Sequence, residues 1–290
     1  MAPSTTGDAS MPRRRRRGIR VAALALSLAA AASVGAVVVS AFRPTEAPPV
    51  AVAQQAPHHG TTAVVASVPF DDAWKRIDQR DHPFVIAVAG DSTGNEPGEW
   101  VDLAFRRLAV ETDRPLVEHP WNLESNAYDP EITANSDAAN APLIVWNGSA
   151  SGKTAAYSLE HIDTLLPKRP DILIINHGLN NVRKPRAVGP EFSNLLAAVE
   201  QRWPASVGYA VILENPRFDK WHEAHKRVLE DVRAWAAPRT NVLLIDVNAA
   251  YLAAEAGPAS FLVGDRLHPN PSGSALTAGT VLDALTRAGT

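Results

Sequence analysis

The chain has 290 residues, 46% of them hydrophobic, which is enough for one large domain with a full core. It contains no cysteine, so disulfides and thiolate metal sites are excluded. Of its 28 basic and 31 acidic residues, six Arg and one Asp lie in residues 1–42, so the remainder carries a net charge of −8. Because nucleic acid binding needs clustered Lys and Arg, this acidity argues against a nucleic acid partner.

The first 66 residues divide by composition into three segments. Residues 1–20 are basic, residues 21–42 carry no charge, and residues 43–66 are rich in Pro and Ala. An uncharged run of 22 residues has about the length of a spanning helix, and the arginines before it should stay cytoplasmic. We expect a transmembrane anchor, or a signal segment if the small residues that follow are cleaved, then an extended linker. A globular domain over 67–290 would then lie outside the cytoplasmic membrane.

The first predicted strand begins at Phe84 and runs into Gly90-Asp91-Ser92. A run this apolar and this short is typical of a parallel strand buried on both faces. Open α/β sheets bind their ligands beyond the carboxyl ends of such strands. Ser92 is therefore a candidate nucleophile, although a Gly-Asp-Ser turn chosen for local hydrogen bonds is the alternative.

Alternating strands and helices follow. Helical spacing of apolar residues predicts helices over residues 99–111, 157–166, 189–203, 221–237 and 272–287, and short apolar runs predict strands near 143–146, 172–175, 209–213 and 242–245. This alternation predicts an α/β fold with a parallel sheet covered on both faces.

Residues 118–141 interrupt the pattern with a long polar stretch that has no clear periodicity. Loops of this length are often functional in compact domains. One hypothesis is that the stretch borders the active site, with Trp121 or Tyr128 stacking on a sugar or covering an acyl chain. The other is a surface excursion with short helical turns.

Several histidines need an interpretation. His222 and His225 lie on a predicted helix, but the spacing is not the His-Glu-x-x-His of zinc proteases, and we expect both to face solvent. His177 follows the third apolar strand and either lines the pocket or makes only local hydrogen bonds.

Asp265 and His268 stand three residues apart just before the last predicted helix. A serine nucleophile needs a base to take its proton and an acid to orient that base. One tight turn can place the carboxylate against one ring nitrogen while the other faces Ser92. The alternative is a turn-capping Asp265 beside a surface histidine.

Two further segments can supply hydrogen-bond donors to the oxyanion that acyl transfer creates. In Asn147 to Thr154, which follows a strand, Gly152 can offer its backbone N–H. In the segment Gly178-Leu179-Asn180, which follows the next strand, Asn180 can offer its side-chain amide.

In this order, Gly90-Asp91-Ser92, Asn147 to Thr154, Gly178-Leu179-Asn180 and Asp265 to His268 resemble the four blocks of the SGNH hydrolases, also called the GDSL esterase/lipase family, within residues 84 to 285. The resemblance implies a three-layer α/β/α sandwich, flavodoxin-like, with a central mainly parallel sheet. It also implies a catalytic triad and three oxyanion donors: Ser92, Asp265 and His268 for the triad, and Ser92, Gly152 and Asn180 for the donors.

Two positions need comment within this resemblance. The third block of the family usually ends in Asp, whereas this chain has Asn181, and we expect the change to affect local packing more than chemistry. Gly148 competes with Gly152 for the donor role, but the pattern of the second block favours Gly152.

The activity implied is that of a serine esterase acting on carboxylic esters, of an acetylated glycan or of a lipid, through an acyl-enzyme and without metal or organic cofactor. One alternative is an acyltransferase that passes the acyl group to a sugar hydroxyl. Another is a non-catalytic glycan-binding module on the same fold.

Overall fold

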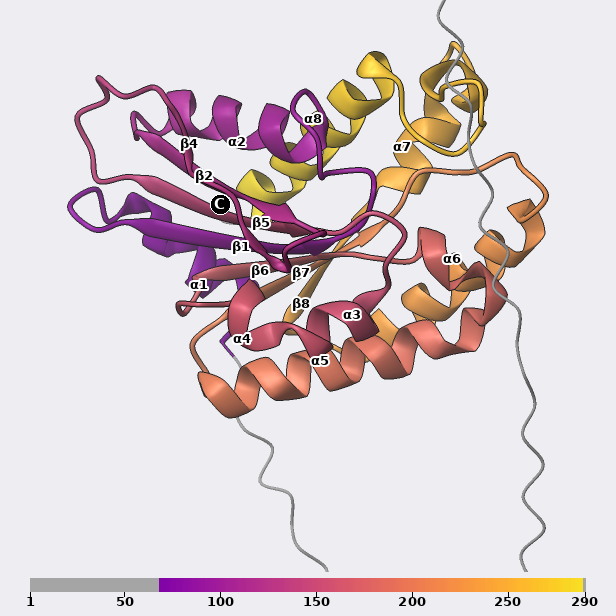
Figure 1. The fold of residues 1–290 in the computed structure, drawn as a ribbon, viewed down its shortest axis with the longest axis horizontal. Coiled ribbons are helices and arrows are strands. Elements are labelled where there is room, and N and C mark those ends of the chain that lie inside the picture. Colours follow the sequence, from indigo (N-terminus) through magenta and orange to yellow (C-terminus); the bar gives the residue numbers. More distant parts are fainter. Residues whose placement is uncertain (1–67, 289–290) are drawn as a thin grey trace, which may run out of the picture. The chain divides into compact units, whose positions relative to one another are not determined.

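A computed structural model of the chain describes residues 68–288 (Figure 1). The predicted basic segment, uncharged span and linker, residues 1–66, lie outside the described residues. Within the described part, no helix is both long enough and apolar enough to cross a membrane.

The described residues build one sheet of eight strands: β1 Phe84–Gly90, β2 Leu116–Asn122, β3 Ala127–Tyr128, β4 Ile132–Ala134, β5 Leu143–Ser149, β6 Ile172–Asn176, β7 Gly208–Leu213 and β8 Val242–Asp246. Neighbours follow the order β3-β2-β5-β1-β6-β7-β8, and β4 pairs with β2. The short strands β3 and β4 are antiparallel to β2, and the other pairings are parallel. This is the mainly parallel sheet that the sequence predicts.

Helices cover both faces of the sheet (Figure 1). One face packs against α1 Phe70–Trp74, α2 Trp100–Glu111, α7 Val247–Ala253 and α8 Pro271–Ala288. The other packs against α3 Ala155–Glu160, α5 Val188–Arg202 and α6 His222–Ala236, with α4 Ile162–Leu165 beside them. Four short 3-10 helices complete the described part: η1 Lys75–Asp78, η2 Leu179–Arg183, η3 Pro185–Ala187 and η4 Pro258–Phe261. The predicted three-layer α/β/α sandwich is confirmed.

The central strand β1 shows why the sequence forms this sandwich. Ile86 and Val88 belong to the core beneath α2 and α8, whereas Ala87 and Ala89 belong to the core beneath α5 and α6. Successive side chains of a strand point to opposite faces, so a strand between two helical layers must be apolar at every position. The uninterrupted apolar run follows from this double burial.

The topology also fixes where a ligand can bind. Strand β1 lies between β5 and β6, and the chain reaches β5 on one side before it crosses to β6 on the other. Connections therefore leave in opposite directions at the carboxyl end of β1, which is the crevice where open α/β sheets place their sites. The segments after β1, β5 and β6 meet at this edge.

Two regions differ from the sequence-based predictions. The helix predicted over 157–166 is divided into α3 and α4 at His161, whose ψ of 18° is not helical. The polar stretch 118–141 contains the end of β2 and the strands β3 and β4, so it is neither a loop throughout nor an excursion with helical turns. Strands of two or three residues are too short to show an alternation in sequence.

Candidate active site

The turn after β1 holds Ser92 at the sheet edge. Asp91 is fully buried, and its Oδ1 accepts hydrogen bonds from the backbone N–H and the hydroxyl of Thr93, both at 3.1 Å. Thr93 Oγ1 in turn accepts from Asn176 Nδ2 at the end of β6, at 2.8 Å. The turn is thus tied to the neighbouring strand, and the half-buried Ser92 directs its Oγ to His268 Nε2 at 2.9 Å.

The loop before α8 brings the acid and the base together. Asp265 Oδ1 accepts from the backbone N–H groups of Leu267 and His268 at 2.9 and 3.0 Å, and Asp265 Oδ2 lies 2.6 Å from His268 Nδ1. Arg266 has φ +60°, so the chain reverses within this turn. Because a carboxylate only accepts, the proton of the neutral ring belongs on Nδ1, which leaves Nε2 to accept from Ser92.

A second loop supports this one. Asn215, just after β7, donates its side-chain amide to Leu267 O at 3.0 Å, and the backbone N–H of Phe218 donates to Arg266 O at 2.8 Å. Asn215 is buried, so the contact is shielded from water. No sequence motif indicates Asn215, because its role depends on where the end of β7 lies in space.

The two predicted oxyanion segments are joined by Asn180. Its Nδ2 donates to Lys153 O at 2.9 Å and to Asp91 Oδ2 at a longer 3.3 Å. The amide therefore links the second block, the third block and the residue before Ser92. The structure brings all five predicted site residues, Ser92, Gly152, Asn180, Asp265 and His268, to this one edge of the sheet.

The geometry separates the two candidate glycines. Gly152 lies in an exposed turn with φ +75°, a conformation that favours glycine, and no heavy atom stands within 4 Å of a Cβ placed on it. Gly148 lies inside β5, where a Cβ would stand 2.5 Å from Leu165 Cδ2 and 2.7 Å from Val88 O. Position 148 has no room for a side chain between Leu165 and Val88, whereas the space beside Gly152 is open to a ligand.

The side chains of Asn181 and His177 contact helices α5 and α3. Asn181 is buried and donates its amide to Glu191 Oε2 of α5 at 3.1 Å, which agrees with a packing role. His177 Nε2 lies 2.8 Å from Ser158 Oγ of α3, and burial lowers the pKa of His177 to about 3, so the ring is neutral. Of the two interpretations of His177, the structure favours local hydrogen bonding.

Comparison with known proteins shows the family of the chain. The family model of the GDSL-like lipase/acylhydrolase family matches residues 88–276, a range that holds all five site residues. The chain belongs to this family. The protein is therefore a serine hydrolase of ester bonds. No curated protein matches the chain.

Solved structures of esterases share the fold of this hydrolase. They include the psychrotrophic esterase EstA from Pseudoalteromonas sp., at 17% identity and a TM-score of 0.50, with 70% of this chain and 97% of that chain covered. A carbohydrate esterase of family 3 from Talaromyces cellulolyticus has 18% identity and a TM-score of 0.51, with 70% and 97% covered. The lipase/acylhydrolase from Enterococcus faecalis has 17% identity and a TM-score of 0.50, with 70% and 96% covered.

The electrostatics of the hydrolase site follow from burial and hydrogen bonding. Burial alone would raise the pKa of Asp265, but the hydrogen bonds from His268 and Leu267 outweigh it, and that pKa is lowered. Asp265 is therefore a carboxylate at neutral pH. For Asp91, burial outweighs the hydrogen bonds that it accepts and raises its pKa to about 6.

A cavity of about 420 Å³, lined by both polar and apolar side chains, adjoins the site on the side of β5 and β2. Ser149 and Ser151 of the second block line it, together with Asn95, three residues beyond Ser92. Its other polar lining residues are Asn122, Glu96, Glu124 and Asp129. None of the described residues that line it is Lys or Arg. Of the two aromatic residues singled out in 118–141, Trp121 reaches this cavity, but its indole is mostly buried and donates to Tyr157 Oη at 3.0 Å.

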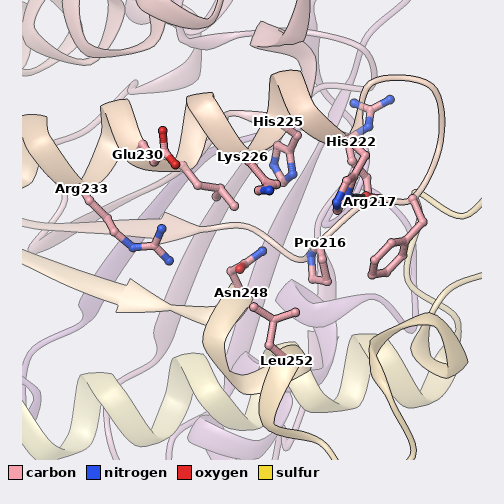
Figure 2. Close-up of a pocket in the computed structure, with 11 residues that line it drawn as sticks. Pro216, Arg217, His222, His225, Lys226, Glu230, Arg233, Asn248 and Leu252 are labelled. Carbon is pink, nitrogen blue, oxygen red and sulfur yellow. Dashed lines mark hydrogen bonds between the residues drawn. The ribbon is translucent and has the colours of Figure 1, made fainter.

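Another cavity, of about 470 Å³, lies between α6 and α7 and contains none of the five site residues. Figure 2 shows Lys226 and Arg233 on one of these helices and Asn248 and Leu252 on the other. His225, expected to face solvent, is buried here because it shares the apolar face of α6 with Val228. Within residues 68–288 no group of three acidic or histidine side chains could hold a metal.

Proposed function

We propose that the protein hydrolyses carboxylic esters through a serine acyl-enzyme. The continuous chain of hydrogen bonds from Ser92 Oγ through the imidazole of His268 to Asp265 carries this proposal. Ser92 Oγ attacks the ester carbonyl carbon while its proton passes to His268 Nε2, and Asp265 stabilises the imidazolium that forms. His268 then gives the proton to the leaving alcohol, and water repeats the sequence to release the acid and free Ser92.

Three donors would stabilise the oxyanion of the tetrahedral intermediate. They are the backbone N–H groups of Ser92 and Gly152 and the side-chain amide of Asn180. One hydrogen of that amide is held by Lys153 O, and the other makes only the 3.3 Å contact with Asp91. This longer contact is the one that a substrate oxyanion would replace.

The polar side chains of the adjoining cavity are suited to a hydroxyl-rich substrate. Amides, hydroxyls and three carboxylates line it beside apolar residues such as Leu123 and Ile132, and the polar groups can bind sugar hydroxyls by hydrogen bonds. The carbohydrate esterase among the solved structures described above agrees with this choice. We propose short acyl esters of glycans, in particular acetates, as the substrate class, acted on outside the cytoplasmic membrane.

The first test is the Ser92→Ala variant, with Ser136→Ala at an exposed position as the matched control. Loss of the nucleophile should lower kcat for 4-nitrophenyl acetate on the order of 10⁶-fold while the fold persists. Labelling by a fluorophosphonate probe should disappear in the same variant and persist in the control. Unchanged turnover by Ser92→Ala would refute the mechanism.

A second measurement addresses the substrate. Initial rates on acetylated xylan or mannan oligosaccharides should exceed those on esters of long-chain acids. Product analysis with a sugar acceptor present separates hydrolysis from transfer: free acetate is the expected product, and an acetylated acceptor would assign the transferase alternative.

A further inference from the structure

A second buried acid lies behind the oxyanion segment. Glu214 follows β7 directly, is 2% exposed, and its Oε2 accepts a hydrogen bond from the backbone N–H of Leu179, the residue before Asn180. The carbonyl of Leu179 accepts from Arg217 Nη1 at 2.7 Å. Gly178 permits this close approach, because a Cβ at that position would stand 2.7 Å from Glu214 Oε2. Glu214 and Arg217 thus hold the backbone N–H and the carbonyl of the residue that precedes Asn180.

Glu214 also reaches the turn that carries Ser92. Glu214 accepts from Leu179 and Asp91 accepts from the adjacent Asn180, so the two buried carboxyl groups are neighbours, and each alters the pKa of the other. Two ionised carboxylates cannot share a hydrogen bond, because neither has a hydrogen to donate, and their repulsion is strong where water is excluded. A hydrogen bond between these two carboxyl groups therefore requires one proton.

The other partners of the two acids decide where that proton lies. Asp91 already accepts from the N–H and hydroxyl of Thr93 and from Asn180. Glu214 accepts from Leu179 through Oε2, whereas its buried Oε1 has no acceptor role at all. A protonated Oε1 that donates to Asp91 gives every oxygen of the pair a partner.

We propose that Glu214 is a positioning residue of this active site, a neutral carboxylic acid that donates to Asp91 and accepts from Leu179. It holds the Ser92 turn and the Asn180 segment at a fixed separation. The charged Arg217, which is paired with Asp219, and the titratable His268 face the pair. Burial raises the pKa of Glu214 well above its ordinary value. An effect of Glu214 on kcat rests on the proposed function, because it acts through Ser92 and Asn180. The protonation state of Glu214 does not depend on that function.

The kinetic test compares Glu214→Gln with Glu214→Ala. Glutamine reproduces a neutral acid, since its NH₂ donates to Asp91 and its carbonyl accepts from Leu179, so Glu214→Gln should keep kcat close to that of wild type. Alanine removes both contacts and should lower kcat about 10²-fold with little change in KM. Glu200→Ala is the matched control, because Glu200 also accepts a backbone N–H but lies on α5 at the far end of β7. It should leave kcat unchanged.

The protonation state has its own test. Infrared spectroscopy of the wild-type protein at neutral pH should show a buried carboxylic acid C=O band that Glu214→Gln removes. This measurement needs no ester substrate and no foldable alanine variant. Absence of the band, or a Glu214→Gln variant as impaired as Glu214→Ala, would overturn the proposal, whereas a band in a protein without esterase activity would count against the proposed function alone.

Discussion

At the scale of single residues, the Asp91 carboxylate connects parts of the site that are far apart in sequence. It receives hydrogen bonds from Thr93 and Asn180, and in the proposed arrangement it also accepts one from Glu214. A buried acid is normally a cost, because desolvation disfavours its charge. Here fixed donors surround the one negative charge and offset part of the cost of its burial, and they give the turn before Ser92 a defined geometry.

This arrangement predicts how stability depends on pH. The pKa of Asp91 is raised from 3.8 to about 6 and that of Glu214 is raised further above 4.5. A folded-state pKa above the unfolded one gives stability that is present below about pH 4 and is lost as pH rises through the folded values. Denaturant unfolding between pH 4 and 9 should therefore show the free energy of unfolding falling less steeply in Glu214→Gln than in wild type.

Parallel curves for wild type and Glu214→Gln would show that Glu214 binds no extra proton in the native state.

At the scale of elements, the strand β5 and the turn after it contain two glycines with different tasks. Gly148 keeps β5 close to Val88 of the neighbouring strand, and Gly152 gives the turn its left-handed residue. The strand needs a small side chain for space, and the turn needs glycine for its dihedral angle. The two tasks are distinguishable by substitution.

Gly148→Ala should mainly reduce stability, by about 1–3 kcal/mol, because the added methyl group overpacks against Leu165 and Val88 O. Gly152→Ala has open space but must hold φ +75°, so its turn should shift and lower kcat by about 10- to 100-fold with a smaller loss of stability. Urea unfolding and kcat of the folded protein separate these outcomes. The reverse pattern would assign the donor role to Gly148.

At the scale of the whole molecule, the strand order places the site at the carboxyl end of β1, where the chain crosses from β5 on one side to β6 on the other. Strands β5 and β6 flank β1, so three segments separated by tens of residues meet beyond one strand. The loop that holds His268 arrives from the side of β7 and is fixed there by Asn215 and Phe218. The hydrolase site thus depends on both halves of the sheet.

The sequence also predicts where this domain works. The uncharged residues 21–42 follow a run of arginines, and we propose that they hold the hydrolase domain on the outer side of the cytoplasmic membrane. The full-length protein should remain in membrane fractions after a carbonate wash. Recovery only from the culture medium would show that the segment is cleaved.

The sequence alone predicted the fold class and the five residues that meet at one sheet edge, because both depend on patterns that neighbouring residues carry. Apolar runs that end in Gly, Ser or Asn marked the strand ends, and the spacing of Asp265 and His268 fits one turn. The short strands β3 and β4 were missed because two or three residues carry no detectable period.

Only the tertiary structure decided which remote groups support the site. Glu214 and Asn215 follow an ordinary apolar strand, and nothing within the chain near them indicates that they contact Asp91, Leu179 and Leu267. His225 became buried because the face of α6 on which it lies packs inward. Such contacts arise from strand order and helix packing, which bring together segments whose separation along the chain carries no information about their distance in space.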